Sequence, residues 1–413
     1  MRVVWIKVGG LWPLNTGGRL RTFELLSALS ATHAITLVTT HGPDDDAAAL
    51  AARLPGLAGV VSVPYAVPKR GSPQFALALA RSWASREPVD LRRWRVPAVA
   101  RTVAAQLASG GWDAIVADFL VSAPNVPRTA VPIVYFAHNV EHQIWRRLAA
   151  IETQPLRRAA LEFEWRKVRR REARMVREAA MTIAVSDADR ARLQADARDA
   201  RIGVVATGVD TDYFRPRPGR AVRKRIVFCG SMDWYPNEDA VVDFAVHVWP
   251  RVKARHPDAS FCVVGRRPSA RVRDLARATG FDVTGTVPDV RPYVAAAEIC
   301  VVPLRVGGGT RIKIFEALAM GTPVVSTTIG AEGLGLSDGL HYVAADDHGA
   351  FASAIDRVFA SHDLRARIAA EGRALVEARY AWPQVAAQFS SLLERAVQPS
   401  PPIAVPLVTP AAS

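Results

Sequence analysis

The sequence predicts an α/β protein made of two doubly wound domains with parallel sheets. The first observation is length, because 413 residues exceed one ordinary core and suit two α/β units of about 150 to 200 residues each. The second is that apolar, strand-like runs alternate with amphipathic, helix-like stretches in both halves of the chain. The third is a Pro- and Gly-rich segment between the two halves. Two such domains imply a cleft.

The elements follow in chain order. Strands are expected in the first half at 3–8, 34–39, 114–117, 133–137 and 181–185. In the second half they are expected at 225–229, 260–264, 283–284, 299–303 and 323–326, as short apolar runs of the kind that parallel sheets bury on both faces. The segment 207–219 lacks apolar periodicity and is expected to join the domains, with the boundary near Pro216.

The end of the chain is helical in pattern over 352–397, and 398–413 combines prolines with small residues, which predicts a disordered tail. We therefore divide the chain into domains at 1–215 and 216–375, a final helix at 376–397 and the tail.

The composition indicates where the protein is located and which class of partner it binds. No apolar run reaches the roughly 18 residues that span a bilayer, and Gly9 and Gly10 interrupt the apolar start, so we expect a cytoplasmic protein. The three cysteines lie in apolar, strand-like runs without metal-site spacing and are expected to be buried and reduced: Cys229, Cys262 and Cys300. The net charge of +14 predicts an anionic partner, such as a nucleotide, a phosphorylated lipid, a membrane surface or nucleic acid, without choosing among them.

A glycine-rich loop between a strand and a helix is the sharpest local signal. The strand at 299–303 is followed by three consecutive glycines and then by a helix-like stretch that stops at Gly321. Glycines let backbone N–H groups converge on an anion, and the helix start adds its positive dipole end. The predicted phosphate ligands are Gly307, Gly308, Gly309 and Thr310.

Charged side chains follow this loop. Arg311 and Lys313 can add positive charge beside a phosphate, and Glu316 lies three residues after Lys313 on the same helix face. A carboxylate there could accept hydrogen bonds from a ribose diol, so the segment indicates a nucleotide. The alternative is a tight turn with these side chains in a solvated ion network.

A second glycine loop follows the first strand. The segment 9–18 leads into a helix expected at 19–30, and Gly17 and Gly18 would approach the same anion if the carboxyl ends of the two sheets face each other. The alternative is an ordinary glycine turn.

A polar cluster follows the strand at 133–137. His138 there could orient a sugar hydroxyl or exchange a proton with it, tuned by a nearby carboxylate. The alternative is a structural helix cap by Asn139.

Two charged groups remain. The acidic pairs at 44–46, 187–189 and 210–212 lie in a loop, at a helix start and in the linker, so we expect no metal site. The segment 145–178 carries eleven Lys or Arg against five Glu with apolar residues at helical spacing. It predicts a basic amphipathic helix pair that is either a solvated face or a contact with anionic lipid headgroups. Phe163 and Trp165 are expected in the core.

Taken together, these motifs resemble the retaining GT-B glycosyltransferases of family four, often called glycosyl transferases group 1, and among them bacterial exopolysaccharide-associated sugar transferases. The resemblance covers nearly the whole chain. It rests on Gly17-Gly18-Arg19, His138, Val185-Ser186-Asp187, the joint from Thr207 to Pro216, Gly230, and the stretch from Gly307 to Val325.

The resemblance implies a metal-independent, retaining hexosyltransferase with two facing Rossmann-like domains and a C-terminal helix that returns to the first. The first domain would bind a glycan or lipid-linked acceptor and the second a UDP- or GDP-linked sugar, with no other cofactor. It places Gly17 and Gly18 at the phosphates, Gly230 in the donor site, Glu316 at the ribose and His138 near the anomeric carbon. The base would lie against Val287, Asp289 and Val290.

Two positions depart from the family pattern. The family has two glutamates separated by seven residues, but the position eight before Glu316 is Gly308. The Arg and Lys that commonly follow Gly230 and hold the diphosphate are also missing, so Arg311 and Lys313 become the candidates for neutralising the leaving group. The alternative functions are those of a catalytically degenerate sugar-binding paralogue, a nucleotide-sugar epimerase and a nucleic-acid-binding protein. We expect no nucleic-acid partner, and we expect peripheral contact with the inner face of the plasma membrane.

Overall fold

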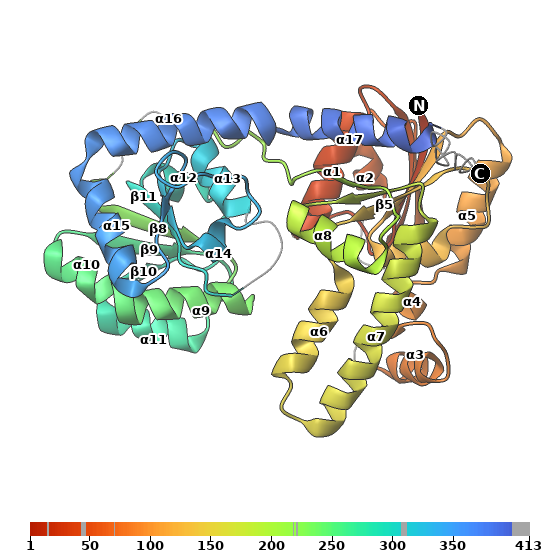
Figure 1. Ribbon diagram of the computed structural model, residues 1–413, viewed down its shortest axis with the longest axis horizontal. Helices are drawn as coiled ribbons and strands as arrows, with labels where there is room; N and C mark the ends of the chain where they lie inside the picture. Colours follow the sequence, from red (N-terminus) through yellow and green to blue (C-terminus); the bar gives the residue numbers. More distant parts are fainter. Residues whose placement is uncertain are drawn as a thin grey trace, which may run out of the picture.

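The computed structural model describes residues 1–14, 16–42, 47–69, 71–217, 219, 222–306 and 312–398. It consists of two α/β domains side by side, bridged along one edge by two long C-terminal helices (Figure 1). Within these residues, no helix is both long enough and apolar enough to cross a membrane. All but the first residue of the predicted disordered tail, 398–413, lies outside the described residues.

The first domain contains a seven-stranded parallel sheet in the order β3-β2-β1-β4-β5-β6-β7. Its central strands are buried almost along their whole length, because helices cover both faces, which is why they read as continuous apolar runs. The strands are β1 (Arg2–Lys7), β2 (Ala34–His41), β3 (Gly59–Pro64), β4 (Ala114–Asp118), β5 (Ile133–Ala137), β6 (Met181–Ala184) and β7 (Ile202–Val204).

Helices of the first domain follow the strands in alternation, and two of them form an antiparallel hairpin that projects from the sheet (Figure 1). The hairpin is the predicted basic helix pair. The helices are α1 (Gly17–Leu29), α2 (Ala47–Arg53), α3 (Pro73–Trp83), α4 (Val89–Arg93), α5 (Pro97–Ala108), the 3₁₀ helix η1 (Leu120–Asn125), α6 (Glu141–Ile151), α7 (Pro155–Glu178) and α8 (Asp187–Asp196).

The second domain repeats the scheme with a six-stranded parallel sheet in the order β10-β9-β8-β11-β12-β13. Its strands are β8 (Arg225–Cys229), β9 (Ser260–Val264), β10 (Asp282–Val283), β11 (Ile299–Val302), β12 (Val324–Ser326) and β13 (Val343–Ala344). Its helices are α9 (Tyr235–Asp243), the π-helical turn η2 (Phe244–Val248), α10 (Trp249–Arg255), α11 (Ala270–Thr279), α12 (Arg291–Ala295), α13 (Ile312–Ala319), α14 (Thr328–Ala331), α15 (His348–Ala360) and α16 (His362–Arg379). The three cysteines are buried and free, as expected.

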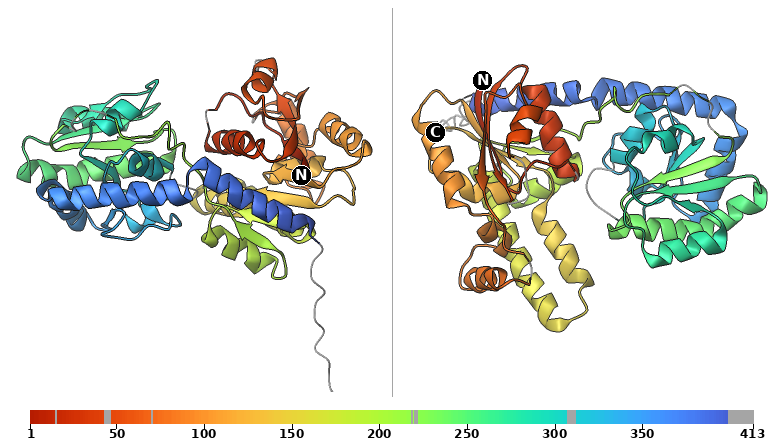
Figure 2. Two further views of the ribbon diagram at one scale, coloured as in Figure 1. Left: turned by 90° about the horizontal axis from the view of Figure 1, so that it is seen from above. Right: turned by 180° about the vertical axis from the view of Figure 1, so that it is seen from behind.

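The last helix, α17 (Trp382–Val397), packs on the first domain although it follows the second, as Figure 2 shows from above. Phe389 is fully buried there, with its ring 5.4 Å from Trp5 and 5.1 Å from Phe136 between centroids. A Cβ at Gly208 in the linker would lie 2.5 Å from the Trp382 ring, so this position requires glycine. The two passages of the chain between the domains are therefore packed against each other.

The predicted two-domain α/β fold with parallel sheets is confirmed. Each strand expected from the sequence is present, within two residues at either end. The sequence reading omitted β3, β7 and β13, which all lie at the outer edge of a sheet.

Candidate active site

Residues of the second domain gather where β8 ends and α13 begins. The Nζ of Lys313, in the first turn of α13, donates a hydrogen bond to Oδ1 of Asn237 at 2.7 Å. The same ammonium lies 4.3 Å from the centroid of the Phe228 ring on β8. Asn237 is buried, and its Nδ2 donates to the carbonyl oxygen of Ser231 at 2.9 Å, so the amide is fixed from both ends.

Gly230 makes room for this arrangement. A Cβ at this position would lie 2.7 Å from Lys313 Nζ and 2.8 Å from Asn237 Nδ2. Gly265, after β9, approaches just as closely from the other side, because a Cβ there would lie 1.8 Å from the Gly230 carbonyl oxygen. The missing side chain at Gly230 thus lets the lysine reach the carboxyl edge of the sheet, and the missing side chain at Gly265 lets the two strand ends pack closely.

Glu316 lies one turn after Lys313 on α13. Burial raises its pKa to about 7, while Lys313 acts in the opposite direction. A carboxyl group near half-ionisation at neutral pH can accept a hydrogen bond from a hydroxyl and can also donate one. Both side chains lie on α13, three residues apart, and their role beside the glycine loop stays a prediction. The remaining predicted ligands lie outside the described residues: Gly307, Gly308, Gly309, Thr310 and Arg311.

The segment predicted to hold the base lies between β10 and α12. Its carboxylate, Asp289, accepts hydrogen bonds from Nε of Arg291 at 2.9 Å and from Arg217 in the linker at 3.3 Å. The hydrogen bonds from Arg291 hold the pKa of Asp289 below its ordinary value. Val287 and Val290 pack partly buried against the core. Asp289 thus anchors the segment to the interdomain linker.

On the first domain, His138 follows β5 and is buried. Its Nε2 lies 2.7 Å from Asp118 Oδ1, and its Nδ1 lies 3.4 Å from Nη1 of Arg21. Burial lowers the pKa of His138 to about 4, which makes the imidazole neutral at pH 7. A neutral ring with its proton on Nε2 suits both neighbours, because Nδ1 can then accept from the guanidinium while the Nε2 proton lies beside the carboxylate.

Asp118 connects this histidine to the first strand and to α1. Its Oδ2 accepts hydrogen bonds from Thr22 Oγ1 at 2.7 Å and from Trp5 Nε1 at 2.9 Å. Burial alone would raise the pKa of Asp118, but His138, Lys7 and the hydrogen bonds outweigh it and lower the pKa. The carboxyl end of the first sheet therefore contains a buried, ordered charge network.

Phe119 covers this network. Its ring stacks on His138, with the ring centroids 3.8 Å apart and the planes at 9°. The Nζ of Lys7, at the end of β1, lies 4.0 Å from the centroid of the Phe119 ring. Its φ of +65° is unusual for a residue with a side chain and is typical of functional sites. A Cβ at Gly18 would lie 2.6 Å from the Phe119 ring, so this glycine is needed for close packing.

The first residues of α1 and α13 meet between the domains. A Cβ at Gly17, the first residue of α1, would lie 3.9 Å from Cδ1 of Ile312, the first residue of α13. The start of α1 and the start of α13 therefore face each other at van der Waals distance. Whether Gly17 and Gly18 share an anion with the loop at 307–310 stays a prediction, because that loop lies outside the described residues.

The alternative role of Asn139 as a helix cap is wrong. The N-terminal end of α6 is instead capped by Glu172 of α7, whose carboxylate accepts hydrogen bonds from the backbone N–H groups of Glu141 at 2.8 Å and His142 at 3.2 Å. The same carboxylate lies 2.6 Å from Nδ1 of His142. This capping fixes the segment that follows His138.

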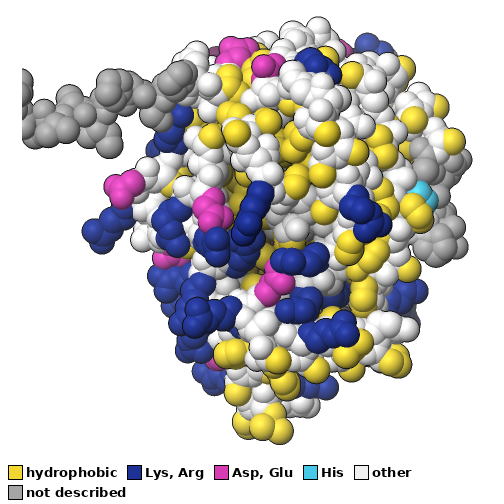
Figure 3. Space-filling model, turned by 90° about the vertical axis from the view of Figure 1, so that its right-hand side faces the viewer, with side chains coloured by type: hydrophobic (Ala, Val, Ile, Leu, Met, Phe, Trp, Pro, Cys, Tyr) yellow, Lys and Arg dark blue, Asp and Glu magenta, His cyan; other side chains and the backbone are white. Residues whose placement is uncertain are grey.

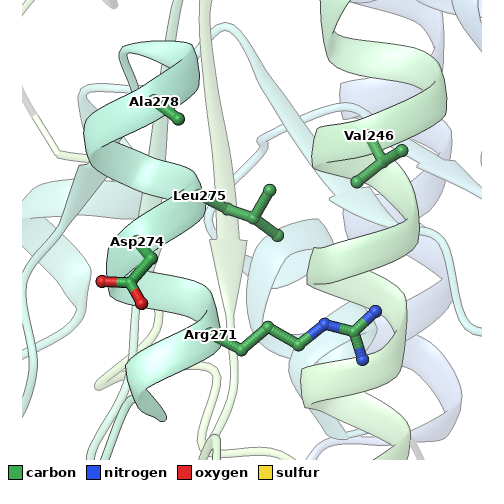
Figure 4. Close-up of a pocket in the computed structure, with 5 residues that line it drawn as sticks. All are labelled: Val246, Arg271, Asp274, Leu275 and Ala278. Atoms are coloured by element: carbon green, nitrogen blue, oxygen red, sulfur yellow. The ribbon is translucent and has the colours of Figure 1, made fainter.

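A further pocket lies away from this region. It has a volume of about 530 Å³ and opens between α11 and η2 on the second domain (Figure 4). Its lining consists of Val246, Arg271, Asp274, Leu275 and Ala278, and contains none of the predicted site residues. Within the described part of the chain, no group of three or more His, Cys, Asp or Glu side chains could hold a metal ion.

Sequence reasoning missed Asn237, Asp118, Lys7, Arg21 and Phe119. Lys7 and Asp118 are polar residues that end otherwise apolar strands, and this signal could have identified them. Asn237 lies in the segment after Gly230, and its side chain meets Lys313 solely through the tertiary fold.

Comparison with known proteins assigns both domains. Residues 16–213 match the model described as Glycosyltransferase Family 4, and 223–361 match the model described as Glycosyl transferases group 1. The phosphatidyl-myo-inositol mannosyltransferase of Mycolicibacterium smegmatis is 31% identical over 226 residues, 51% of this chain and 56% of that protein. The MMP alpha-(1->4)-mannosyltransferase of Mycolicibacterium hassiacum is 26% identical over 286 residues, 66% of this chain and 67% of that protein. The chain thus aligns with little more than half the length of the first of these relatives.

Solved structures share the fold at low sequence identity. Sucrose-phosphate synthase from Thermosynechococcus elongatus has a TM-score of 0.69 at 16% identity, covering 95% of this chain and 98% of the other. Anabaena HepE in complex with UDP and glucose has a TM-score of 0.64 at 15% identity, covering 95% and 99%. Because the two family models together account for both domains and the fold agrees over nearly the full length, this chain belongs to the family-four glycosyltransferases of the GT-B fold.

Proposed function

We propose that this protein transfers a sugar from a UDP- or GDP-linked donor to a glycan or lipid-linked acceptor, with retention of configuration and without a metal ion. The observation that supports the donor site is the position of Lys313, which Asn237 holds at the carboxyl edge of the second sheet. Lys313 follows Ile312, the residue of α13 that lies beside Gly17 of α1. A nucleotide diphosphate is the ligand that a fixed cation, a glycine loop and the half-buried Glu316 suit best.

The relatives support the substrate classes. One is described as GDP-mannose-dependent and acts on a phosphatidylinositol monomannoside, and HepE was solved with UDP-glucose. The phosphatidyl-myo-inositol mannosyltransferases are named for a lipid acceptor. By this likeness we assign the present protein to cell-surface glycan synthesis, including exopolysaccharide, at the cytoplasmic face of the membrane.

The proposed reaction is a front-face substitution. The bond between the anomeric carbon and the donor phosphate oxygen breaks, and the acceptor hydroxyl oxygen bonds to the same face of that carbon. The acceptor proton passes to the departing phosphate, whose charge Lys313 and Arg311 would stabilise. Gly17, Gly18 and the glycines at 307–309 would contact the phosphates and the sugar through backbone N–H groups.

In this proposal His138 contacts a sugar hydroxyl only after Phe119 has moved. Its ring is stacked beneath Phe119 and held by Asp118 and Arg21, so a contact with a sugar hydroxyl requires Phe119 to turn away. We propose this contact because His138 follows β5 at the sheet edge that faces the second domain. Gly230, Val287, Asp289 and Val290 complete the proposed donor site.

The first test is a thermal-shift screen of UDP, GDP, ADP and their common sugars, with and without EDTA, because a ligand that binds only the folded state raises apparent stability. We expect a metal-independent shift with one nucleoside diphosphate. It should disappear in Glu316→Ala and persist in the matched control Glu371→Ala, which changes an exposed glutamate on α16. No shift with any nucleotide would contradict the proposal.

Product analysis separates the alternatives. A transferase forms a glycoside with the donor's anomeric configuration, whereas an epimerase returns a nucleotide sugar of changed configuration. A degenerate paralogue would bind the donor and leave it intact during prolonged incubation with acceptor extracts. An inverted product would overturn retention alone.

A further inference from the structure

Three helices of the first domain form a projection away from the sheet. We call α3, α6 and the first half of α7, residues 155–166, the helical projection; it is the lowest part of the molecule in Figure 1. The turn between α6 and α7 lies at its tip. None of the proposed donor or catalytic residues belongs to it.

Large apolar side chains are exposed on this projection. Leu156, next to the tip, is 87% exposed, and Phe163 is 47% exposed, which corrects the expectation that Phe163 belongs to the core. Four more apolar residues are 38% to 52% exposed: Leu77, Trp83, Ile144 and Leu148. Six of the fourteen large exposed hydrophobics among the described residues therefore lie on three helices.

An apolar pocket of about 180 Å³ opens between these helices. Its walls come from α3, α4, α6 and α7 and include Phe75, Leu79, Trp83, Trp145, Leu148 and Leu161. Glu164 and Lys167, 2.8 Å apart and both buried, tie α7 to the backbone around Ser82 and Val89 below it. Because this buried network holds α3 against α7, the pocket is preformed in the absence of any ligand.

Positive charge surrounds the apolar surface. Between residues 144 and 163 the chain carries four arginines and two glutamates, and the glutamates already have partners. Glu162 pairs with Arg166 at 2.9 Å, and Glu152 accepts a hydrogen bond from the backbone of Gln154. The arginines are all exposed: Arg146, Arg147, Arg157 and Arg158. Figure 3 shows basic side chains grouped around hydrophobic atoms at the lower end of this face.

We propose that the helical projection docks on the surface of an anionic bilayer. Leu156, Phe163 and their neighbours would enter the interface between headgroups and acyl chains, while the four arginines would contact lipid phosphates. A second copy of this chain fits less well, because a two-fold contact would bring the arginines of two tips together. Nucleic acid would leave the aliphatic side chains exposed to water, because it offers them no apolar surface.

The test is sedimentation of the full chain with vesicles of phosphatidylcholine plus phosphatidylglycerol, compared with phosphatidylcholine alone. It requires no donor, so its result is independent of the proposed glycosyl transfer. We expect binding to the anionic vesicles that weakens with salt. Arg157→Ser with Arg158→Ser should weaken it roughly 30-fold, at about 1 kcal/mol per arginine. Leu156→Ser with Phe163→Ser should weaken it by about tenfold or more.

The matched control is Arg251→Ser with Arg271→Ser, which removes two exposed arginines from the second domain and should leave vesicle binding unchanged. Equal loss in this control would show that net charge, and not the projection, determines binding, and would overturn the inference. So would a lack of binding to anionic vesicles. A dimer in sedimentation velocity that Leu156→Ser with Phe163→Ser dissociates, without vesicle binding, would assign the surface to self-association instead.

Discussion

Replacement of Asn237 by aspartate tests whether Lys313 faces the donor diphosphate. The side chain keeps its size, but a carboxylate replaces the amide oxygen that lies 2.7 Å from the ammonium. Two opposite unit charges at that distance attract by roughly 6 kcal/mol at an effective dielectric constant of about 20, so the aspartate would hold and neutralise the lysine. A charged hydrogen bond to phosphate contributes about 1.5 to 3 kcal/mol, and its loss weakens diphosphate binding roughly 10- to 150-fold.

The assay is calorimetric titration with the nucleoside diphosphate and, separately, with the matching nucleoside. The nucleoside has no phosphate, so its affinity should be the same in wild type and Asn237→Asp. Asn237→Ala serves as the comparison, because it removes the hydrogen bond to Lys313 without placing a carboxylate beside it. The loss of diphosphate affinity should be clearly smaller in Asn237→Ala than in Asn237→Asp. Wild-type diphosphate affinity in Asn237→Asp would refute the placement of Lys313, whereas a wild-type protein that binds no nucleotide would refute the proposed function itself.

Three further predictions concern residues of both domains. Arg311→Ala with Lys313→Ala should raise the activation free energy of transfer by several kcal/mol, which a turnover assay detects as a lower kcat. Wild-type turnover would exclude both residues from catalysis. Burial raises the pKa of Glu316 to about 7, so the folded protein should lose stability relative to Glu316→Gln as pH rises from about 4.5 to 7. This difference, at most about 3 kcal/mol, is measured by denaturant unfolding of both proteins across that range, and a constant difference would contradict it. Gly18→Ala places a Cβ 2.6 Å from the Phe119 ring and should lower the melting temperature or displace the ring, either of which is visible by calorimetry and near-UV circular dichroism. An unchanged spectrum and melting temperature would show that the loop adapts freely.

The sequence predicted the strands that have two neighbours and failed at several sheet edges. Central strands such as β4 and β11 are buried on both faces and read as uninterrupted apolar runs. The three omitted strands each pair on one side only, and two of them, β7 and β13, have three and two residues. A segment that short cannot show a period of two, and an edge strand needs less apolar character.

The sequence predicted those parts of the candidate site whose residues lie close together along the chain. Lys313 and Glu316 lie on one helix beside the glycine loop, and their spacing alone brings them together. Asn237 lies 76 residues before Lys313, and the contact arises because β8 and β11 are neighbours in the sheet. Asp118 likewise meets His138 because β4 pairs with β5, a relation that follows from strand order and not from local pattern.

Phe119 determines how the first-domain network could reach a substrate. Its left-handed backbone, φ +65°, costs about 1 to 3 kcal/mol and persists only because its surroundings hold it. Those surroundings are the stack on His138, about 0.5 to 1.5 kcal/mol, and the Lys7 ammonium over the ring, about 0.5 to 2 kcal/mol. The strain and the contacts are of similar size, so a backbone change that relaxes φ and turns the ring aside has a small net cost. Because Gly18 packs against the same ring, a phosphate bound at the start of α1 would act directly on the residue that covers His138. Donor binding and uncovering of the histidine would therefore be coupled through one aromatic side chain.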